Sequence, residues 1–459
     1  MLYHLSEYLS QFSNAGPLRL TRYISFRAIF AMLTAFLITL LIGRLMINFL
    51  YRRKIRDIVR DYSVMSVDSK SGTPTMGGLL MFIAILSSVL IWSNLLSPFT
   101  LYLLMAMFWF AAVGAYDDYL KIRYKNSDKG LSRSKKYLSQ IGYAVVFGVL
   151  FLHPATSPLP HPDRGGTCQA NWPGGCSRQC SKNADCQNRA CGVKNSFCRT
   201  GLCRTLPCKN KDGKAIACST AKSCKGAGCG NSTTCAQPWQ VQFPGTSKAS
   251  FTFRPSQLYI PFYTQPVMDM SWLYLLVIIF MIVYAANAVN FADGLDGLAT
   301  IPALFSYLVY AIYAYILGNA IMSKHLLFPM LPGAGEAAVF CAAIAGAGLG
   351  FLWFNAYPAE VFMGDTGSIM LGGVLGTLMV LLKQEVLFFL VGGIFLVELF
   401  SVMIQDWLGI KVLGRRLVFR APIHHTYQHR GISEPKIVVR FWIVSGMLAL
   451  LAIAALKIR

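Results

Sequence analysis

The sequence predicts an all-α integral membrane protein with ten transmembrane helices. Of its 459 residues, 55% are hydrophobic and only 14% are charged, whereas roughly 25% of the residues in soluble domains are charged. Ten apolar runs each approach the roughly 20 residues that a helix needs to cross a hydrocarbon core. Twelve of the thirteen cysteines lie between Cys168 and Cys235, so the cysteines describe one segment and not the whole chain.

The ten apolar runs are expected to be helices, with boundaries good to a few residues. They lie near 24–50, 75–93, 98–119, 138–154, 271–290, 297–317, 336–354, 368–383, 386–408 and 438–456. Several runs are short or contain glycine, as in the sequence AGAGLG at 345–350, which indicates close helix packing. No cleavable signal peptide is expected, because the first run is followed by a basic segment and then by further runs.

Lysine and arginine predict the orientation of these helices. They gather at 52–60, 121–136 and 411–440, after the first, third and ninth runs. Ten alternating helices would place these three connections on one side, and the positive-inside rule assigns that side to the cytoplasm. Both termini and the connection between the fourth and fifth helices are then expected outside.

The predicted organisation has three parts: helices 1–4 in residues 1–160, a cysteine-rich inserted module in 161–250, and helices 5–10 in 251–459. The module is rich in Gly, Pro, Asn, Ser and Lys. Because disulfides persist outside the cytoplasm, a small disulfide-rich extracytoplasmic insertion is expected, with its pairing left open. A zinc module is the alternative, since the spacings Cys176-x3-Cys180 and Cys198-x4-Cys203 resemble those of metal ligands.

The formal net charge of +22 does not predict a nucleic-acid partner. Residues 161–250 hold 13 Lys and Arg against 3 Asp and Glu, so this one segment supplies +10 of the total. The remaining positive charge gathers beside the membrane spans, where it is expected to set topology or to contact lipid headgroups.

Carboxylates cluster at three span ends that are predicted to be cytoplasmic. Asp117 and Asp118 end the third span, residues 290–297 open the sixth, and Asp365 opens the eighth. A fourth cluster, Pro422 to His425, lies in the last basic connection. Ionisable residues are costly near hydrocarbon, so these clusters mark a candidate site.

The residue types in these clusters indicate phosphate chemistry on a metal. Mg²⁺ prefers carboxylate oxygens and bridges substrate phosphates. Glycines beside Asp293, Asp296 and Asp365 allow backbone amides to approach an anion. Each signal alone is weak, because an aspartate at a helix start is more often an N-cap.

Spacing gives two further expectations within these clusters. Asp293 and Asp296 are three residues apart and could share a helix face. Adjacent helical residues point about 100° apart, so Asp117 and Asp118 are not expected to share one role, and one of them could only order the loop.

A transport path is the competing interpretation of charged residues within the membrane. Carriers place ionisable residues near the middle of the bilayer, whereas these spans are expected to have apolar middles. Carboxylates gathered on one face of the membrane favour an enzyme that uses a cytoplasmic substrate and a lipid acceptor.

Several motifs, taken in order along the chain, resemble those of a known family. They are Gly72–Gly78 (GTPTMGG), Tyr116–Tyr119 (YDDY), Asn287–Asn290 (NAVN) with Asp293–Ala299 (DGLDGLA), Gly350–Asn355 (GFLWFN), Phe362–Ser368 (FMGDTGS) and Ala421–His425 (APIHH). Together they closely resemble the phospho-N-acetylmuramoyl-pentapeptide transferases, within the polyprenyl-phosphate N-acetylhexosamine-1-phosphate transferase superfamily. The resemblance covers roughly 1–154 and 255–459.

The resemblance implies a ten-helix enzyme of the bacterial inner membrane, usually a homodimer, with a cytoplasmic active site and external termini. Such an enzyme transfers phospho-N-acetylmuramoyl-pentapeptide from UDP-MurNAc-pentapeptide to undecaprenyl phosphate. The products are lipid I and UMP, and the reaction serves peptidoglycan synthesis, and with it cell shape and division. Whether transfer is a single displacement or passes through an aspartyl intermediate is left open.

The resemblance also implies roles for individual residues. Asp365 would coordinate Mg²⁺, and Asp117 and Asp118 would activate the acceptor phosphate and position substrate. With these, His424 would belong to the catalytic set. The implied substrate-binding residues are Lys70, Thr75, Asn290, Asp293, Asp296, Phe362 and His425.

Two departures from the family pattern stand out. The family usually has three consecutive histidines, but the third place here is Thr426, so this position is not expected to be an essential base or ligand. The cysteine-rich segment of about 90 residues replaces a connection that is short in the family, and it is given no catalytic role. Two alternative functions remain: transfer of another N-acetylhexosamine phosphate to a polyprenyl phosphate, and a non-enzymatic lipid carrier.

Overall fold

A computed structural model describes residues 2–9, 17–53, 55, 72–124, 129–159 and 253–458, and the backbone of short strands between 166 and 252. The chain divides into two compact units. One comprises residues 1–153 with 256–459, and the other residues 154–255. The first unit is a helical bundle with one two-stranded ribbon, β8 (Gln257–Leu258) with β9 (Met268–Asp269).

Eight helices of the described residues are long and apolar enough to cross a membrane. They are α2 (Ile24–Arg52), α4 (Pro98–Tyr124), η4 with α8 (Ser271–Ala292), α9 (Thr300–Leu317), α11 (Gly335–Asn355), α12 (Gly364–Leu381), α14 with η5 (Gly393–Val412) and α16 (Glu434–Ala454). The second and fourth apolar runs form α3 (Gly78–Trp92), of 15 residues, and α5 (Arg133–Leu152). The helical membrane fold is thus confirmed, while ten complete spans remain a prediction.

Shorter helices complete the bundle: α1 (Leu2–Leu9), η1 (Pro17–Arg22), α10 (Ala320–His325), α13 (Phe388–Val391) and α15 (Ile423–His429).

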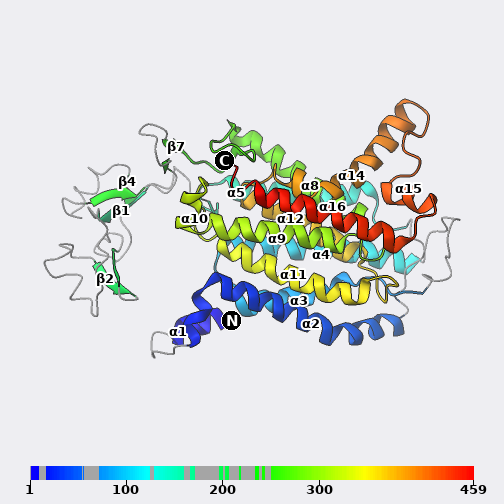
Figure 1. Ribbon diagram of the computed structural model, residues 1–459, viewed down its shortest axis with the longest axis horizontal. Helices are drawn as coiled ribbons and strands as arrows, with labels where there is room; N and C mark the ends of the chain where they lie inside the picture. Colours follow the sequence, from blue (N-terminus) through cyan, green and yellow to red (C-terminus); the bar gives the residue numbers. More distant parts are fainter. Residues whose placement is uncertain are drawn as a thin grey trace. The chain divides into compact units, whose positions relative to one another are not determined.

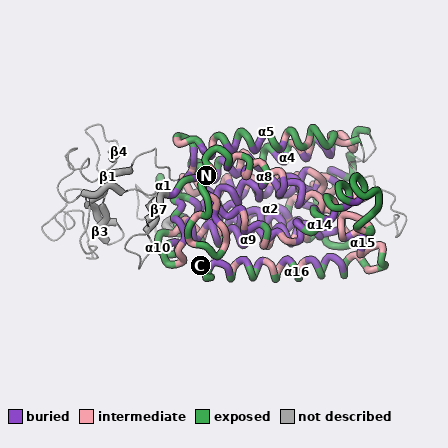
Figure 2. The backbone as a smooth tube through the Cα atoms, turned by 90° about the horizontal axis from the view of Figure 1, so that it is seen from above, coloured by how far each residue is buried: buried purple, intermediate pink, exposed green. Residues whose placement is uncertain are grey.

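Two helices form the centre of the bundle. Helix α12 packs along α4 and α8, and α11 packs along α2 and α9. In an 18-residue apolar stretch of each helix, 89% of the residues of α12 are buried, but only 22% of those of α2. A methyl group at Gly346 would overlap the backbone oxygen of Met32, so glycine allows α11 and α2 to touch backbone to backbone. Figure 2 shows exposed residues along α5 and α16, which lie at opposite edges of the bundle in that view.

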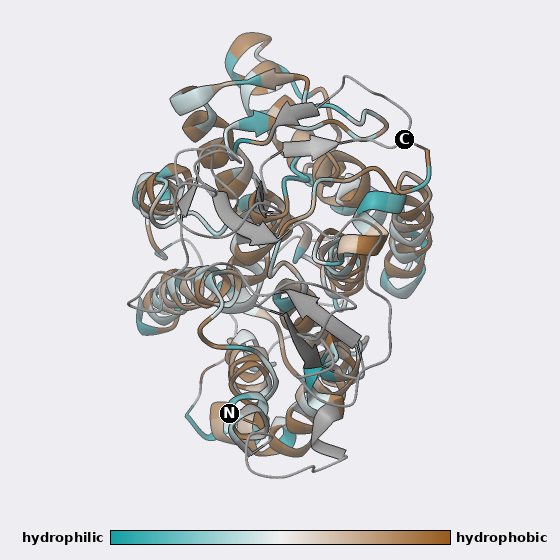
Figure 3. Ribbon diagram, turned by 90° about the vertical axis from the view of Figure 1, so that its left-hand side faces the viewer, coloured by the Kyte–Doolittle hydropathy of each residue, from teal (hydrophilic) through white to brown (hydrophobic). Residues whose placement is uncertain are grey.

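The outer helices carry large hydrophobic residues on their exposed faces. Examples are Leu41 and Leu45 on α2, which are 74% and 69% exposed, and Leu450 on α16, which is 62% exposed. Figure 3 shows hydrophobic residues along the helices. In water such faces would be unfavourable, whereas lipid tails solvate them.

The ninth apolar run is not one helix, contrary to the prediction from its length. It is divided into α13, α14 and the π-helical segment η5 (Ile404–Val412). The break falls at Gly392 and Gly393, where glycine lowers helix propensity. The run also has a carboxylate within it, since Glu398 on α14 is fully buried. The expectation of apolar middles is therefore wrong for this run.

The expectation that Asp293 and Asp296 share a helix face is also wrong. Helix α8 ends at Ala292 and α9 begins at Thr300, so both aspartates lie in the connection between the helices. Gly297 has φ of +75°, a backbone conformation that breaks a helix and that glycine adopts without strain.

The two ends of the bundle differ in what they carry. Figure 1 shows both chain termini at the end opposite α15. Near the starts of α2 and α11, Arg27 and Glu336 form a buried bidentate ion pair with N–O distances of 2.8 and 2.6 Å. Motifs named in the sequence analysis gather at the other end, where α4 and α8 finish and α12 begins.

The second unit contains short antiparallel strands. They form a β4-β1-β5 sheet (Ala217–Cys218, Gly166–Ala170, Thr233–Ala236) and the pairs β2-β3 (Ser196–Arg199, Leu202–Thr205) and β6-β7 (Gln240–Gln242, Ser250–Thr252). The backbone register places Cys168 opposite Cys235, and Cys198 opposite Cys203.

Candidate active site

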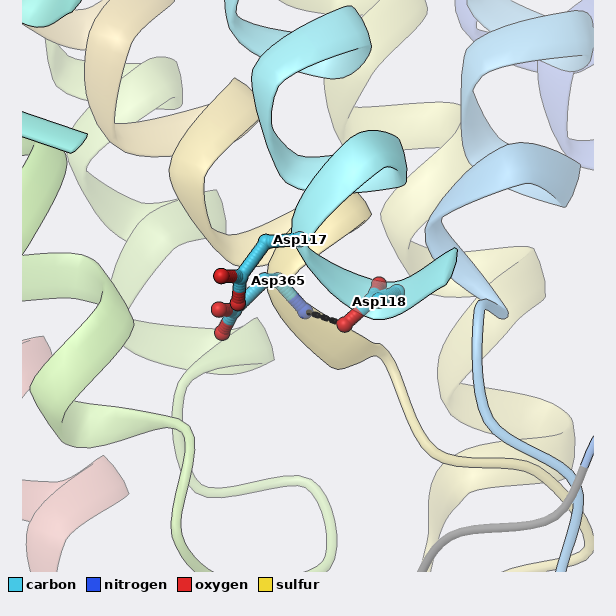
Figure 4. Close-up of side chains that lie close together, drawn as sticks. All are labelled: Asp117, Asp118 and Asp365. Atoms are coloured by element: carbon cyan, nitrogen blue, oxygen red, sulfur yellow. Dashed lines mark hydrogen bonds between the residues drawn. The ribbon is translucent and has the colours of Figure 1, made fainter. Parts of the chain in front are cut away.

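Three aspartates meet where α4 ends and α12 begins. Asp117 and Asp118 lie in the last turns of α4, and Asp365 lies in the first turn of α12. One oxygen from each of the three carboxylates can be chosen so that all lie within 4.8 Å of one another. Figure 4 shows the carboxylates of Asp117 and Asp365 side by side, while that of Asp118 is turned to the backbone of Asp365. The sequence analysis placed these aspartates at span ends on one face of the membrane, and the structure brings the three together.

Asp118 caps the start of α12 from a neighbouring helix. Its carboxylate accepts hydrogen bonds from the backbone N–H of Asp365 at 3.1 Å and of Thr366 at 2.9 Å, and from the Thr366 hydroxyl at 2.6 Å. The first N–H groups of a helix have no partner within the helix, so this carboxylate supplies one. These contacts are those of a residue that orders the α12 start, one of the two roles that spacing left open.

Glycine permits the close approach of α4 and α12. A methyl group at Gly114 would overlap the backbone oxygen of Asp365. Gly364, the first residue of α12, has φ of +69°, which disfavours any side chain. Both glycines therefore help to bring the first turn of α12 against the carboxylates of α4.

Two lysines neutralise the paired carboxylates of Asp117 and Asp365. Lys121 Nζ lies 2.7 Å from Asp117 Oδ2 and 2.8 Å from Asp365 Oδ2. Lys136 Nζ lies 2.7 Å from Asp365 Oδ2 and 3.3 Å from Asp117 Oδ2. Like charges this close would repel strongly without cations between them. The sequence analysis named the basic segment but gave neither lysine a role.

The connection between α4 and α5 folds over Asp117. The backbone N–H of Leu131 donates to Asp117 Oδ1 at 2.5 Å, and the neighbouring Gly130 lies against the same oxygen. Asp117 is therefore only 1% exposed although it sits at the end of a helix. This fold of the chain also brings Lys136, in the first turn of α5, to the aspartates.

Asn290 joins the cluster from α8. Its side-chain N–H₂ group donates to Asp365 Oδ1 at 2.7 Å and to the Ser368 hydroxyl at 2.8 Å. Asn290 thus holds Oδ1 of Asp365, whereas the two lysines contact Oδ2. The last turn of α8 therefore contacts the aspartates, while the substrate-binding role that the resemblance implies for Asn290 stays a prediction.

The segment before α12 is paired with the segment before α3. Phe362 N–H donates to the Pro74 oxygen, and Gly77 N–H donates to the Phe362 oxygen, both at 2.8 Å. This pairing places Thr75 next to Gly364, the residue before Asp365, and Phe362 lies two residues before Gly364. Lys70, predicted to contact substrate, lies outside the described residues.

Asp293 and Asp296 lie in the α8–α9 connection, which starts three residues after Asn290. Asp293 is partly exposed, whereas Asp296 is 5% exposed. Asp296 Oδ2 accepts from the Ala359 N–H at 3.1 Å, and its own N–H donates to Glu434 Oε1 at 2.9 Å. Asp296 therefore joins this connection to two other segments of the bundle.

His424 lies against the same connection, and His425 packs beside it with ring centroids 4.2 Å apart. His424, 1% exposed, packs its Nε2 atom against Gly294 and places Nδ1 3.1 Å from Glu398 Oε2. His425 Nδ1 lies 2.8 Å from Gln428 Oε1. Burial, and then the neighbouring His424, lower the pKa of His425 to about 4, so this ring is neutral at pH 7.

Thr426, at the place of the family's third histidine, makes a backbone contact. Its hydroxyl donates to the Arg420 oxygen at 2.5 Å and accepts from the Arg420 N–H at 3.1 Å. The side chain is 8% exposed. It fastens α15 to the segment before it, which agrees with the expectation that this position is not a base or ligand.

The aspartate cluster suits a hard divalent cation. Mg²⁺ takes carboxylate oxygens and leaves coordination positions for water and phosphate. Asp118 is occupied by backbone donors, so Asp117 and Asp365, whose carboxylates lie together, are the pair that could hold an ion. The ammonium groups of Lys121 and Lys136 border the same space and suit phosphate oxygens.

Comparison with known proteins also indicates a transferase. The family model described as glycosyl transferase family 4 matches residues 242–383. The phospho-N-acetylmuramoyl-pentapeptide-transferase of Maridesulfovibrio salexigens is 35% identical to this chain over 461 residues, and those of Desulfotalea psychrophila and Nitratidesulfovibrio vulgaris are 36% identical over 460 residues. Each comparison covers 100% of both chains. With its motifs, its aspartate cluster and its full-length similarity, the chain belongs to the phospho-N-acetylmuramoyl-pentapeptide transferase family.

Proposed function

We propose that this enzyme transfers phospho-N-acetylmuramoyl-pentapeptide from its uridine diphosphate carrier to undecaprenyl phosphate, forming lipid I and UMP. The observation that carries the proposal is the full-length similarity to transferases of this name. The site agrees with it, since carboxylates and ammonium groups lie at one end of a membrane bundle. A soluble nucleotide and a lipid phosphate can both reach such a place.

The reaction replaces one phosphoanhydride bond with another and leaves the ester between the sugar and its phosphate intact. An oxygen of the lipid phosphate forms a bond to the sugar-bearing phosphorus, and the bond from that phosphorus to the UMP oxygen breaks. The electron pair leaves with UMP. Negative charge grows on the phosphoryl oxygens, so fixed cations near them lower the barrier. Lys121 and Lys136 are proposed to supply this charge, and Asn290 to hold the carboxylate of Asp365.

We propose Asp365 as the Mg²⁺ ligand, with Asp117 beside it. Bound there, the ion would polarise the pyrophosphate and neutralise its charge. Asp117 is also proposed to handle the acceptor phosphate, and Asp118 to keep Asp365 in place through the start of α12. Thr75, Phe362, Asp293 and His425 border the cluster or the α8–α9 connection and are proposed to line the substrate pocket with Lys70 and Asp296.

A direct assay tests the function. The purified protein is incubated with UDP-MurNAc-pentapeptide, undecaprenyl phosphate and Mg²⁺, and released UMP and the lipid product are measured. We expect UMP only when both substrates and Mg²⁺ are present, and none in excess chelator. UMP release with UDP-N-acetylglucosamine instead would identify the sister activity, and no UMP with any such nucleotide would contradict a transferase.

We further propose a homodimer in the bacterial inner membrane, with the aspartate end of the bundle in the cytoplasm. An impermeant thiol reagent tests the orientation in sealed cells. Single cysteines introduced beside Asp118 or Asp365 should react only after permeabilisation. Reaction from outside in intact cells would contradict this orientation.

The cysteine-rich segment is proposed to be an extracytoplasmic module held by disulfides. Directly opposed residues of an antiparallel ladder have Cα atoms about 4.5–5.5 Å apart, within the range that disulfides span. The register therefore favours pairing of Cys168 with Cys235 and of Cys198 with Cys203. Mass spectrometry of peptides from the non-reduced protein would identify these pairs.

A further inference from the structure

Glu398 is a buried carboxylate close to His424 to which neither the sequence motifs nor the proposed chemistry gives a role. It lies on α14 and is 0% exposed. Among the described residues, neither of its oxygens meets the distance and angle of a hydrogen bond. A buried charge without a partner is costly. Nδ1 of His424, a protonatable group, lies 3.1 Å from Oε2 of Glu398.

His424 is likewise buried without an aligned hydrogen-bond partner among the described residues. The ring is 1% exposed, and within the described part of the chain neither ring nitrogen meets hydrogen-bond geometry. Nδ1 is at hydrogen-bond distance from Glu398, so a small rotation of the ring would align the pair. The other nitrogen, Nε2, lies against Gly294, between Asp293 and Asp296.

The two ring nitrogens of His424 therefore have different neighbours: Glu398 at Nδ1 and the α8–α9 connection at Nε2. A carboxylate on Nδ1 fixes both the proton and the plane of a histidine ring, because the tautomer follows the hydrogen bond made by the other nitrogen. With the Nδ1 proton held by Glu398, Nε2 is the nitrogen left to face the α8–α9 connection. That connection continues from Asn290, which holds Asp365.

We infer that Glu398 is a positioning residue for His424: its carboxylate holds the Nδ1 proton and thereby presents Nε2 to the substrate at the α8–α9 connection. The inference rests on the proposed function, because it concerns the same transfer. It also predicts the tautomer of His424, which can be observed without turnover.

Kinetics give the first test. Glu398→Ala should lower kcat by about 10- to 100-fold, since outer hydrogen-bond partners that orient a histidine contribute on this scale. Glu398→Gln should recover most of the rate, because its amide oxygen can still accept the Nδ1 proton. The control is Glu336→Ala, which also removes a buried carboxylate, at the other end of the bundle. A purely structural role predicts equal losses in the two alanine variants at matched folded fraction, and no rescue by glutamine.

A double-mutant cycle tests whether Glu398 acts through His424. In the His424→Asn background, Glu398→Ala should cause no further loss of kcat, because residues of one unit are not additive. Two losses that multiply would overturn the inference.

Nuclear magnetic resonance separates this inference from the proposed function. The protein has seven histidines, so in ¹⁵N-histidine-labelled protein the His424 signals are assigned by their loss in His424→Asn. The wild type should show a protonated Nδ1, and Glu398→Ala should shift the proton to Nε2. An unchanged tautomer would overturn the inference even if wild-type transfer is normal. A protonated Nδ1 in a wild type without transfer would contradict only the function.

Discussion

At the scale of single residues, the three aspartates divide into two kinds. Asp118 gives its oxygens to three donors at the start of α12, while the carboxylates of Asp117 and Asp365 share two lysines. The adjacent residues Asp117 and Asp118 therefore have different contacts. The division follows from helix geometry, since neighbouring side chains point about 100° apart.

Substitution by asparagine should separate these two kinds. Asp365→Asn should reduce transfer by at least about 100-fold and leave folding intact, because an amide is a poor ligand for a hard cation. Asp118→Asn should lower the free energy of unfolding by about 1–3 kcal/mol, because the amide N–H₂ would face backbone donors. The measurements are UMP release and thermal unfolding in detergent. Full turnover by Asp365→Asn would remove it from the metal site.

Replacing Lys136 should reduce transfer far more than replacing its neighbour Lys135. Lys136→Met removes an ammonium group 2.7 Å from Asp365, and the loss of one such charge at a phosphoryl site should lower kcat/KM by about 100-fold or more. Lys135→Met is the matched control, because Lys135 is exposed on the same turn of α5. Equal rates of UMP release in the two variants would show that Lys136 is not part of the phosphate site.

Some site residues could be predicted from the sequence and others could not. Asp117, Asn290 and Asp365 lie in specific motifs, and they meet in the structure. Lys121 offered a usable signal, because it follows Asp117 by four residues in a helix. Lys136 offered no such spacing signal, since it lies in a different helix, α5, 19 residues after Asp117. Glu398 offered a signal that was not used, a single carboxylate in an apolar run.

At the scale of helices, the approach of α4 to α12 sets the separation of the carboxylates. A methyl group at Gly114 would overlap the backbone of Asp365, which cannot move aside as a flexible side chain can. Gly114→Ala should therefore push the start of α12 away and reduce both stability and transfer.

Gly142→Ala on α5 is the control for this change. No heavy atom lies within 4 Å of the added methyl group, so the higher helix propensity of alanine should raise stability by up to about 1 kcal/mol. Thermal unfolding and UMP release measure both variants. A Gly114→Ala enzyme with wild-type stability and activity would contradict the close-contact argument.

Helix positions were easier to predict than helix interruptions. Apolar runs identified the helices because length and composition decide whether a segment crosses a bilayer. They did not identify the break at Gly392 and Gly393, because glycine within an apolar run can either continue or end a helix. The three-residue spacing of Asp293 and Asp296 suggested a shared helix face, but spacing alone does not show that a backbone is helical, and Gly297 adopts a positive φ in this connection.

At the scale of the whole molecule, the helical bundle and the segment that holds the twelve clustered cysteines fall in separate compact units. Deleting residues 161–250 and joining the ends with a short linker should leave Mg²⁺-dependent transfer largely intact, because lengthening or shortening an exposed loop changes its closure entropy only slowly. UMP release and thermal unfolding of the deletion variant are the measurements. A well-folded variant without transfer would show that the segment is needed for catalysis.

The position of the two termini has a practical consequence. Both lie at the end of the bundle opposite α15 (Figure 1). An affinity handle or a fluorescent protein fused to either terminus is therefore separated from the aspartates by the length of the helices. Helices of about 20 residues are roughly 30 Å long, so such fusions can be used for purification, imaging or surface attachment while the nucleotide's approach stays open.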